Sequence, residues 1–426
     1  MEGETLTYKL WRWSVTAAAV WWFLGLNLFI YQIVTFFLFM GMLYMSNRAS
    51  AGLYFPPSTG YILCIAVFYF LSIFLHVFFV GAEASRVIAA LYNLSFWIMG
   101  FMLIMVLSNA FSSFCVAPFM KTFTRLAWMM GVAAAAMLWL WRTGHREVIF
   151  ETPLYFLTRF LGDTQLVESS LLVRPLLMDW FASANRPRFN MFSPYPTASG
   201  AITVIVLAMI LTRAAMERQI KSVWLWILVV LNLIGLVMTL SRMSLLAFVF
   251  GGMAVFLLQK KNMSLWILLI FGAFAAALPL LQQILEYMLS LREGSNDIRM
   301  QIYVYSLQQL QGPEWILGYG VKPRDDAFMF PLGSHSTYIS SLFKCGLMGL
   351  TALIGFQVSL LWRWYKLKPW AALSRRDFLL WRACGWVFIG IGLWLFTEDI
   401  DAPQLLAFLY FSVVGVFEGF RRRLLQ

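Results

Sequence analysis

The stretch from Gly333 to Leu361 reads GSHSTYISSLFKCGLMGLTALIGFQVSLL. From Ser336 onward it is apolar for longer than the roughly 20 residues that an α-helix needs to cross a bilayer. Lys344 is the only charged side chain in this run, and His335 stands directly before it, between two serines. The stretch therefore predicts a transmembrane helix with a histidine directly before its N-terminal end.

Apolar runs of similar length recur along the whole chain, and the composition agrees with them. Of the 426 residues, 61% are hydrophobic and 12% are charged, whereas a soluble domain has about 25% charged residues. We therefore expect an all-α polytopic membrane protein that forms a single membrane domain over residues 1–426. The first run shows no small-residue cleavage site, so we expect it to be a retained span and not a signal peptide.

The apolar runs predict about twelve transmembrane helices. In the first pair, Trp13 to Tyr44 is nearly unbroken, and only Gly25-Leu26-Asn27 indicates a turn. The expected limits are near 12–26, 28–46, 59–81, 86–108, 124–141, 197–212, 222–240, 243–258, 264–284, 336–361, 380–397 and 403–419.

Basic residues predict the orientation of the chain in the membrane. The C-terminal tail carries Arg421, Arg422 and Arg423, and the 362–379 connection carries further Lys and Arg on the same side of a twelve-span chain. By the positive-inside rule this side is cytoplasmic, so both termini are expected in the cytoplasm. The net charge of +12 requires no nucleic acid as a partner, because the anionic headgroups of the lipid bilayer account for it.

Two long outer loops, about 142–196 and 285–335, are expected to contain short helices. Loops of this length usually carry function, so the functional residues are expected to face the periplasm or the cell exterior. In the first loop, SSLLVRPLLMDWFAS (169–183) has apolar residues near helical spacing. We interpret it as a helix lying on the outer membrane surface, although a packed loop helix would have the same periodicity.

His335 is the first candidate for chemistry. A hydroxyl of Ser334 or Ser336 can cap the helix that follows, and this places His335 at a helix N-terminus, where the dipole disfavours the charged imidazolium. A neutral histidine at a water-accessible surface can act as a general base. The alternative is an interfacial histidine that bonds a loop carbonyl.

Arginines on the outer side are the second group of candidates. Arg242 stands in LSRMS between two apolar runs, and Arg299 lies in SNDIRMQIYVYSLQQL, which reads as an amphipathic helix. Guanidinium groups bind phosphate oxygens in a bidentate manner, so the set indicates a polyanionic, lipid-linked substrate. Ion pairing with outer acidic residues is the alternative for each single arginine. The other predicted substrate-binding residues are Arg186, Arg188, Arg292, Ser336 and Lys344.

Lys344 and the acidic residues are open to structural interpretations as well. Lys344 lies deep in its span, where a buried ion pair or helix packing would explain it as well as a functional role. Asp325-Asp326 could be a base or a solvated turn, and TEDIDAP (397–403) could simply mark the end of a span.

Several common functional signatures are missing from the sequence. There is no Walker A motif, no G-x-G-x-x-G after a strand and no G-x-S-x-G, so an ATP-driven pump is not indicated. The four cysteines are not arranged in C-x-x-C spacing and the three histidines are far apart. No metal and no cofactor are therefore predicted.

The order of three segments resembles the O-antigen ligase and polymerase superfamily. They are LSRMSLLAFVFGG (240–252), IRMQIYVYSLQQLQGPEWILGYG (298–320) and PLGSHSTYISSLFKCGLMGL (331–350), with FNMFSPYPTASGA (189–201) as a looser match. That family tends to show an Arg before an amphipathic helix, a G-x-G turn, and a His followed by Asn or Ser at the start of a Gly- and Leu-rich span. The resemblance covers roughly 190–360, and the chain departs from the common pattern at Ser336, where many members have Asn.

The resemblance implies a metal-independent glycosyltransferase that uses an undecaprenyl-diphosphate-linked oligosaccharide on the outer face of the bacterial plasma (inner) membrane. Arg242 and Arg299 would then hold the diphosphate, and His335 would be the catalytic residue. The GSHS form and the modest second loop are more similar to polymerases of O-antigen, capsule and exopolysaccharide repeat units than to ligases. A chain-length regulator and a flippase would be further partners.

Two other functions remain open at this point. One is an O-antigen ligase that transfers the lipid-linked glycan to lipid A-core. The other is a transporter or flippase of lipid-linked sugars, which predicts ionisable residues near the middle of the membrane. Most polar candidates in this sequence are instead expected at the outer surface.

Overall fold

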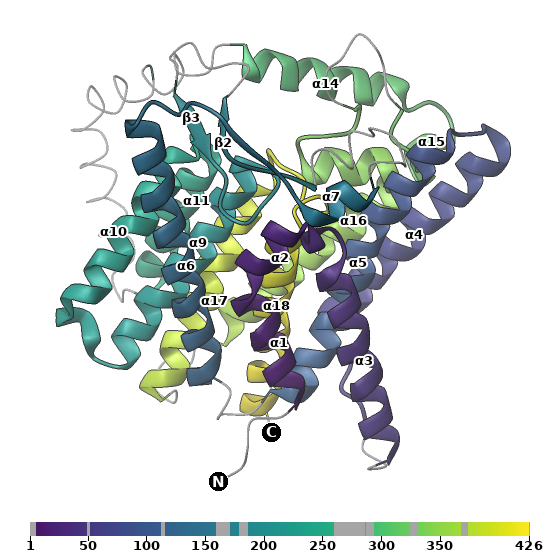
Figure 1. The fold of residues 1–426 in the computed structure, drawn as a ribbon. Coiled ribbons are helices and arrows are strands. Elements are labelled where there is room, and N and C mark those ends of the chain that lie inside the picture. The colour runs from purple at the N-terminus through teal and green to yellow at the C-terminus, as the bar shows by residue number, and fades with distance from the viewer. Residues whose placement is uncertain are drawn as a thin grey trace.

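The structure is a computed structural model of the chain. It describes residues 6–48, 52–111, 116–158, 171–178, 186–259, 286, 294–323, 331–367 and 374–425. Helices make up most of these residues, so the predicted all-α polytopic class is confirmed, with one small sheet as an addition. Figure 1 shows both termini at one end of the helical bundle and α14 (Ser295–Gln309) across the opposite end. We call these the termini end and the loop end.

The described residues up to Arg142 form helices on both sides of the bundle (Figure 1). The N-terminal apolar run is divided into four helical pieces, and Gly25 in a left-handed conformation (φ 78°) ends the second of them, α2. This confirms the turn predicted at Gly25-Leu26-Asn27. These helices are α1 (Leu6–Thr16), α2 (Ala18–Leu24), the short 3-10 helix η1 (Leu26–Leu28), α3 (Ile30–Arg48), α4 (Pro57–Phe79), α5 (Ala84–Ala110) and α6 (Val116–Arg142).

The part of the chain after residue 190 supplies the most buried spans, together with α14 at the loop end. It contains α9 (Pro196–Met216), η4 (Gln219–Lys221), α10 (Val223–Met238), α11 (Arg242–Leu258), α14, α15 (Glu314–Leu317), α16 (Thr337–Lys366), α17 (Arg375–Trp394) and α18 (Gln404–Leu425). α18 lies at the centre of the bundle (Figure 1), and nearly all the residues of its membrane-spanning stretch are buried. Small residues allow this close packing: a Cβ on Gly415 would lie 2.9 Å from Leu107 Cβ on α5.

Eight of the described helices are long and apolar enough to span a membrane, and α10 and α11 are shorter apolar helices. Their positions follow the predicted spans closely, because each apolar run has become one helix. The exception is the first predicted span, which is divided between α1 and α2. The predicted span 264–284 lies outside the described residues.

A small antiparallel sheet lies at the loop end, in the order β1-β2-β3. Its strands are β1 (Val148–Glu151), β2 (Leu172–Met178) and β3 (Pro187–Phe189), and the short helix α7 (Pro153–Thr158) follows β1.

The predicted surface helix over 169–183 is wrong for residues 172–178, which form β2. Pro175 gives the physical reason, because a proline inside a helix removes a hydrogen bond and clashes with the preceding turn. In the sheet, the register of β1 shifts between Val148 and Phe150, opposite Pro175, and the Pro175 carbonyl accepts a bond from Asn190 N at 2.9 Å. The rest of 169–183 lies outside the described residues, apart from Leu171.

Candidate functional site

His335 is held in a left-handed backbone conformation at the start of α16. Its φ is 65°, a region that residues other than glycine occupy at a cost of about 1–3 kcal/mol. The hydroxyl of Tyr303 on α14 donates to the His335 carbonyl at 2.6 Å, and the side chain of His335 is half-buried. Burial raises the pKa of Tyr303 to about 12, so this hydroxyl keeps its proton at neutral pH.

Ser336 is the N-cap of α16, as one of the two predicted caps. Its side chain is 2% exposed and accepts from Ile339 N at 3.4 Å. The next residue, Thr337, donates its N–H to the carbonyl of Leu395 at 2.9 Å and to that of Glu398 at 3.1 Å. These bonds attach the beginning of α16 to the loop between α17 and α18.

That loop contains three carboxylates, Glu398, Asp399 and Asp401, which we call the acidic turn. Each carboxylate pairs with a basic side chain from a different segment of the chain. The pairs are Arg299–Glu398 (2.6 Å), Lys322–Asp399 (2.9 Å) and Lys344–Asp401 (2.6 Å). Burial raises the pKa of Asp399, and the charge of Lys322 acts in the opposite direction. The acidic turn is therefore more than the end of a span.

Lys344 lies inside the protein and forms the buried ion pair that was one of its predicted roles. Lys344 as a whole residue is 1% exposed, and Asp401 also accepts from Trp97 Nε1 at 3.2 Å. The ammonium stands 5.5 Å from the centre of the Tyr69 ring. This geometry accounts for the charge within the span, and a substrate-binding role of Lys344 stays a prediction.

α16 is broken where Lys344 stands. Gly346 has φ 62° and ψ −166°, which interrupts the helix. The turn Gly318-Tyr319-Gly320, which we call the wedge, fits into the break: Tyr319 N donates to Phe343 O at 2.6 Å and Gly320 N to Lys344 O at 3.1 Å. Backbone groups freed by a helix break must find partners inside the protein, and the wedge supplies them.

The wedge needs glycine because it touches backbone on both sides. A Cβ on Gly318 would lie 2.4 Å from Cys345 N, and a Cβ on Gly320 would lie 2.5 Å from the carbonyl oxygen of Ser72 on α4. The G-x-G turn of the sequence is thus a packing device between α4 and α16.

Arg188 and Arg242 both lie at the break between α10 and α11. Arg188 lies on β3, is 6% exposed, and donates from Nε to the Thr239 carbonyl at 2.9 Å. Arg242 is half-buried at the first position of α11, where Ser241 is the N-cap and accepts from Ser244 N at 3.3 Å. The N-terminal end of a helix favours anions.

The register of α11 against α17 places Arg242 near the same loop as Arg299 and His335. The two helices are antiparallel, because a Cβ on Gly251 would meet Trp386, whereas one on Gly390 would meet the Ala247 carbonyl at 2.8 Å. Arg242 lies about 7.5 Å along the axis before Ala247. This puts it level with the end of α17, where Thr337 and Arg299 contact Leu395 and Thr397.

The remaining predicted residues are less closely tied to this region. Arg186 is exposed and directly precedes β3. Arg292, Asp325 and Asp326 lie outside the described residues. Among the residues that the structure describes, no three His, Cys, Asp or Glu side chains lie close enough to share a metal ion.

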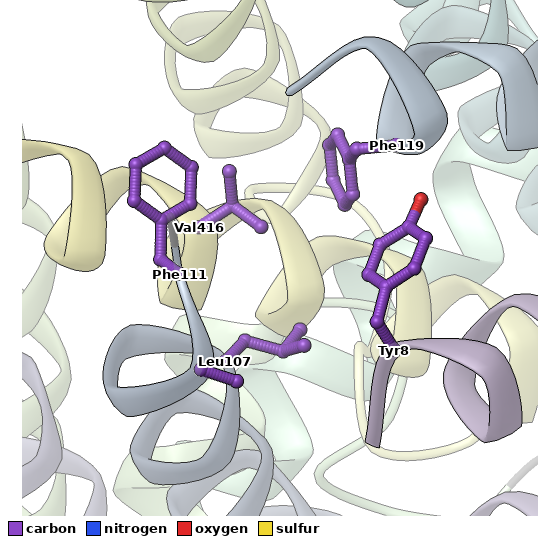
Figure 2. Close-up of a pocket in the computed structure, with 6 residues that line it drawn as sticks. Tyr8, Leu107, Phe111, Phe119 and Val416 are labelled. Atoms are coloured by element: carbon purple, nitrogen blue, oxygen red, sulfur yellow. The ribbon is translucent and has the colours of Figure 1, made fainter. Parts of the chain in front are cut away.

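An apolar pocket exists elsewhere in the bundle, between α1, α5, α6 and α18. Figure 2 shows Tyr8, Leu107, Phe111, Phe119 and Val416 around it. Its lining contains no carboxylate, imidazole or guanidinium group, so it offers no group for acid–base chemistry or anion binding. The polar constellation at the loop end is therefore the candidate active site.

The acidic turn was not found from the sequence. The one local signal was the density of acids in TEDIDAP, and it indicated a span end as well as a site. Its partners lie 99, 77 and 57 residues away, so the pairing became visible only in three dimensions.

Comparisons with known proteins identify the same part of the chain. Residues 227–354 match a family model described as O-antigen ligase, whereas a search of curated proteins found no match. The matched segment runs from α10 into α16 and includes Arg242, Arg299 and His335. Residues 227–354 of this multi-pass membrane protein are therefore similar to the O-antigen ligase family.

Proposed function

We propose that the protein is a glycosyltransferase that polymerises undecaprenyl-diphosphate-linked oligosaccharide repeat units. The observation that supports the proposal is that Arg299 on α14 and the His335 segment before α16 both contact the loop that follows α17, with Arg242 of α11 level with the end of α17. These elements come from the segment that matches the O-antigen ligase family.

The proposed reaction is a displacement at an anomeric carbon. A hydroxyl of the acceptor sugar attacks this carbon and forms the new glycosidic bond, while the bond to the phosphate oxygen breaks and the lipid diphosphate leaves. His335 takes the proton of the attacking hydroxyl as general base. Negative charge grows on the leaving diphosphate, and preorganised arginines stabilise that charge more in the transition state than in the ground state.

Arg188 and Arg242 are the best placed to receive the diphosphate, because they lie together at the N-terminal end of α11. Arg299 is paired with Glu398 at 2.6 Å. Removal of one such electrostatic contact in an active site costs about 10²–10³ in rate. The reaction needs no metal in this scheme.

The site is proposed to face the periplasm or cell exterior from the bacterial plasma membrane. Support comes from the basic residues, because Arg363, Arg421, Arg422 and Arg423 lie toward the termini end, which is the cytoplasmic side under the positive-inside rule. The lipid-linked donor would enter from the bilayer. A chain-length regulator and a flippase are proposed partners.

A ligase is the second candidate, because the matching family model is described as O-antigen ligase. One assay distinguishes the two. The purified protein in proteoliposomes receives a defined undecaprenyl-diphosphate oligosaccharide, with and without a lipid A-core acceptor. Ladders without the acceptor indicate a polymerase, and transfer only with the acceptor indicates a ligase. Movement of the lipid-linked sugar across the bilayer without any transfer would point to a flippase and contradict the proposal.

His335→Ala tests the mechanism in this assay. We expect product formation to be abolished, while His145→Ala, which changes an exposed histidine after α6, keeps wild-type rates. Wild-type ladders from the His335 variant would remove this residue from catalysis.

A further inference from the structure

The acidic turn connects separate segments of the candidate site through ion pairs. It reaches α14, the residues that follow the wedge, and the interior of α16, and all three pairs are largely buried. The pairs balance three positive charges with three negative ones, so the cluster adds no net charge to the site. The three carboxylates therefore act by ordering the basic side chains that they pair with.

The backbone of the turn holds the His335 segment as well. Thr337 Oγ1 donates to the Glu398 carbonyl at 2.7 Å and accepts from Ile400 N at 3.1 Å. Thr337 follows His335 by two residues, and Tyr303 on α14 donates to the His335 carbonyl. The turn and α14 thus both restrain the segment that carries the histidine.

Glu398 is the member of the turn that touches a predicted substrate-binding arginine. Arg299 Nη2 donates to Glu398 Oε1 at 2.6 Å, and Nη1 donates to the Thr397 carbonyl at 3.4 Å. The two side chains are 18% and 12% exposed. A charge-assisted bond of this length, mostly removed from water, fixes the orientation of a guanidinium.

We propose that Glu398 is a positioning residue of the transferase, which holds the Arg299 guanidinium in the orientation that the diphosphate leaving group requires. This inference rests on the proposed function. An arginine that is not restrained loses rotamer freedom when it binds an anion, which corresponds to an interaction weakened by up to about 30-fold. The bond to Glu398 removes this loss before the substrate arrives, because the side chain is ordered beforehand.

The test compares Glu398→Ala, Glu398→Gln, Arg299→Ala and the double variant Arg299→Ala/Glu398→Ala. Transfer from a defined undecaprenyl-diphosphate oligosaccharide is measured in proteoliposomes and expressed per folded molecule. We expect kcat/KM to fall by about 10- to 30-fold in Glu398→Ala and by less in Glu398→Gln, which keeps an acceptor oxygen. Because Glu398 acts through Arg299, the double variant should be no slower than Arg299→Ala alone.

The matched control is the exposed pair Arg213–Glu217, which also joins a guanidinium to a carboxylate through two bonds, at 2.8 and 3.0 Å. It lies at the end of α9, on the opposite end of the bundle from α14. Glu217→Ala and Glu217→Gln should leave kcat/KM unchanged, because exposed pairs contribute little.

Three results would overturn the inference. The first is a double variant whose loss equals the product of the two single losses. The second is a Glu398→Ala protein that unfolds at a lower temperature but has wild-type kcat/KM per folded molecule, because Glu398 would then contribute to stability and not to catalysis. The third is a higher kcat/KM in Glu398→Gln, which indicates that Glu398 competes with the diphosphate for Arg299.

A second readout separates this inference from the proposed function. If the wild-type protein transfers no glycan, the proposed function fails. The same four variants are then titrated with inorganic pyrophosphate, and the shift of the unfolding temperature is measured in detergent. A pyrophosphate concentration for the half-maximal shift that is about tenfold higher in Glu398→Ala than in the wild type, and no higher in the double variant than in Arg299→Ala alone, supports positioning. An unchanged requirement overturns it.

Discussion

The buried pair between Lys344 and Asp401 gives a quantitative prediction about stability. The side chains are 2% and 4% exposed, and the ammonium lies 2.6 Å from the carboxylate. Lys344→Met fills a similar volume but leaves Asp401 as a buried charge without its cation. Removal of one partner of such a pair costs about 3–5 kcal/mol, so we expect a loss of this size in the free energy of unfolding.

The double variant Lys344→Met/Asp401→Leu separates the pair from its burial. When both charges are replaced by apolar groups, the cost of the pair itself is close to zero. Trp97 Nε1 then loses its acceptor at 3.2 Å, which costs about 1–3 kcal/mol. We therefore expect the double variant to be more stable than Lys344→Met by about 2 kcal/mol.

The measurement is the free energy of unfolding of the purified protein in mixed micelles, followed by tryptophan fluorescence. Lys366→Met is the control on the same helix, since Lys366 is exposed, and its change should stay within about 0.5 kcal/mol. The reasoning would be refuted if the double variant were less stable than Lys344→Met by the free energy that Asp401→Leu costs on its own, because the two residues would then act independently.

Two further variants test the wedge and the support of His335. Gly318→Ala should destabilise the protein more than Gly81→Ala, which has a similar φ (81° against 83°) but no atom within 4 Å of the new Cβ; equal unfolding temperatures would rule out the tight wedge. Tyr303→Phe removes the bond to the His335 carbonyl and should cost about 0.5–1.5 kcal/mol and lower the transfer rate. Because the folded pKa of Tyr303 is raised to about 12 from about 10 in the unfolded chain, its stabilisation is complete below pH 10 and is lost as the pH approaches 12. In thermal scans from pH 9 to 12, Tyr303→Phe should lose less stability than the wild type, and an equal loss would contradict the assignment.

The local signals of the sequence predicted local structure well. Apolar runs long enough for a bilayer became helices, Ser336 became the cap of α16, and Gly25 became a turn. Each of these depends on residues within one or two turns of the position itself. The predicted helix at 172–178 failed because apolar spacing was weighed without Pro175, whose missing N–H favours the strand.

The sequence by itself determined the class of the protein, most of its spans and the segments that carry the candidate arginines and the histidine. Only the tertiary structure decided which charges meet: that Lys344 is neutralised by Asp401, that Arg299 is held by Glu398, and that the wedge closes the break in α16. The physical reason is that burial of an ionic or backbone group requires a partner, and folding supplies that partner from segments 24 to 99 residues away, beyond the reach of any periodicity in the chain.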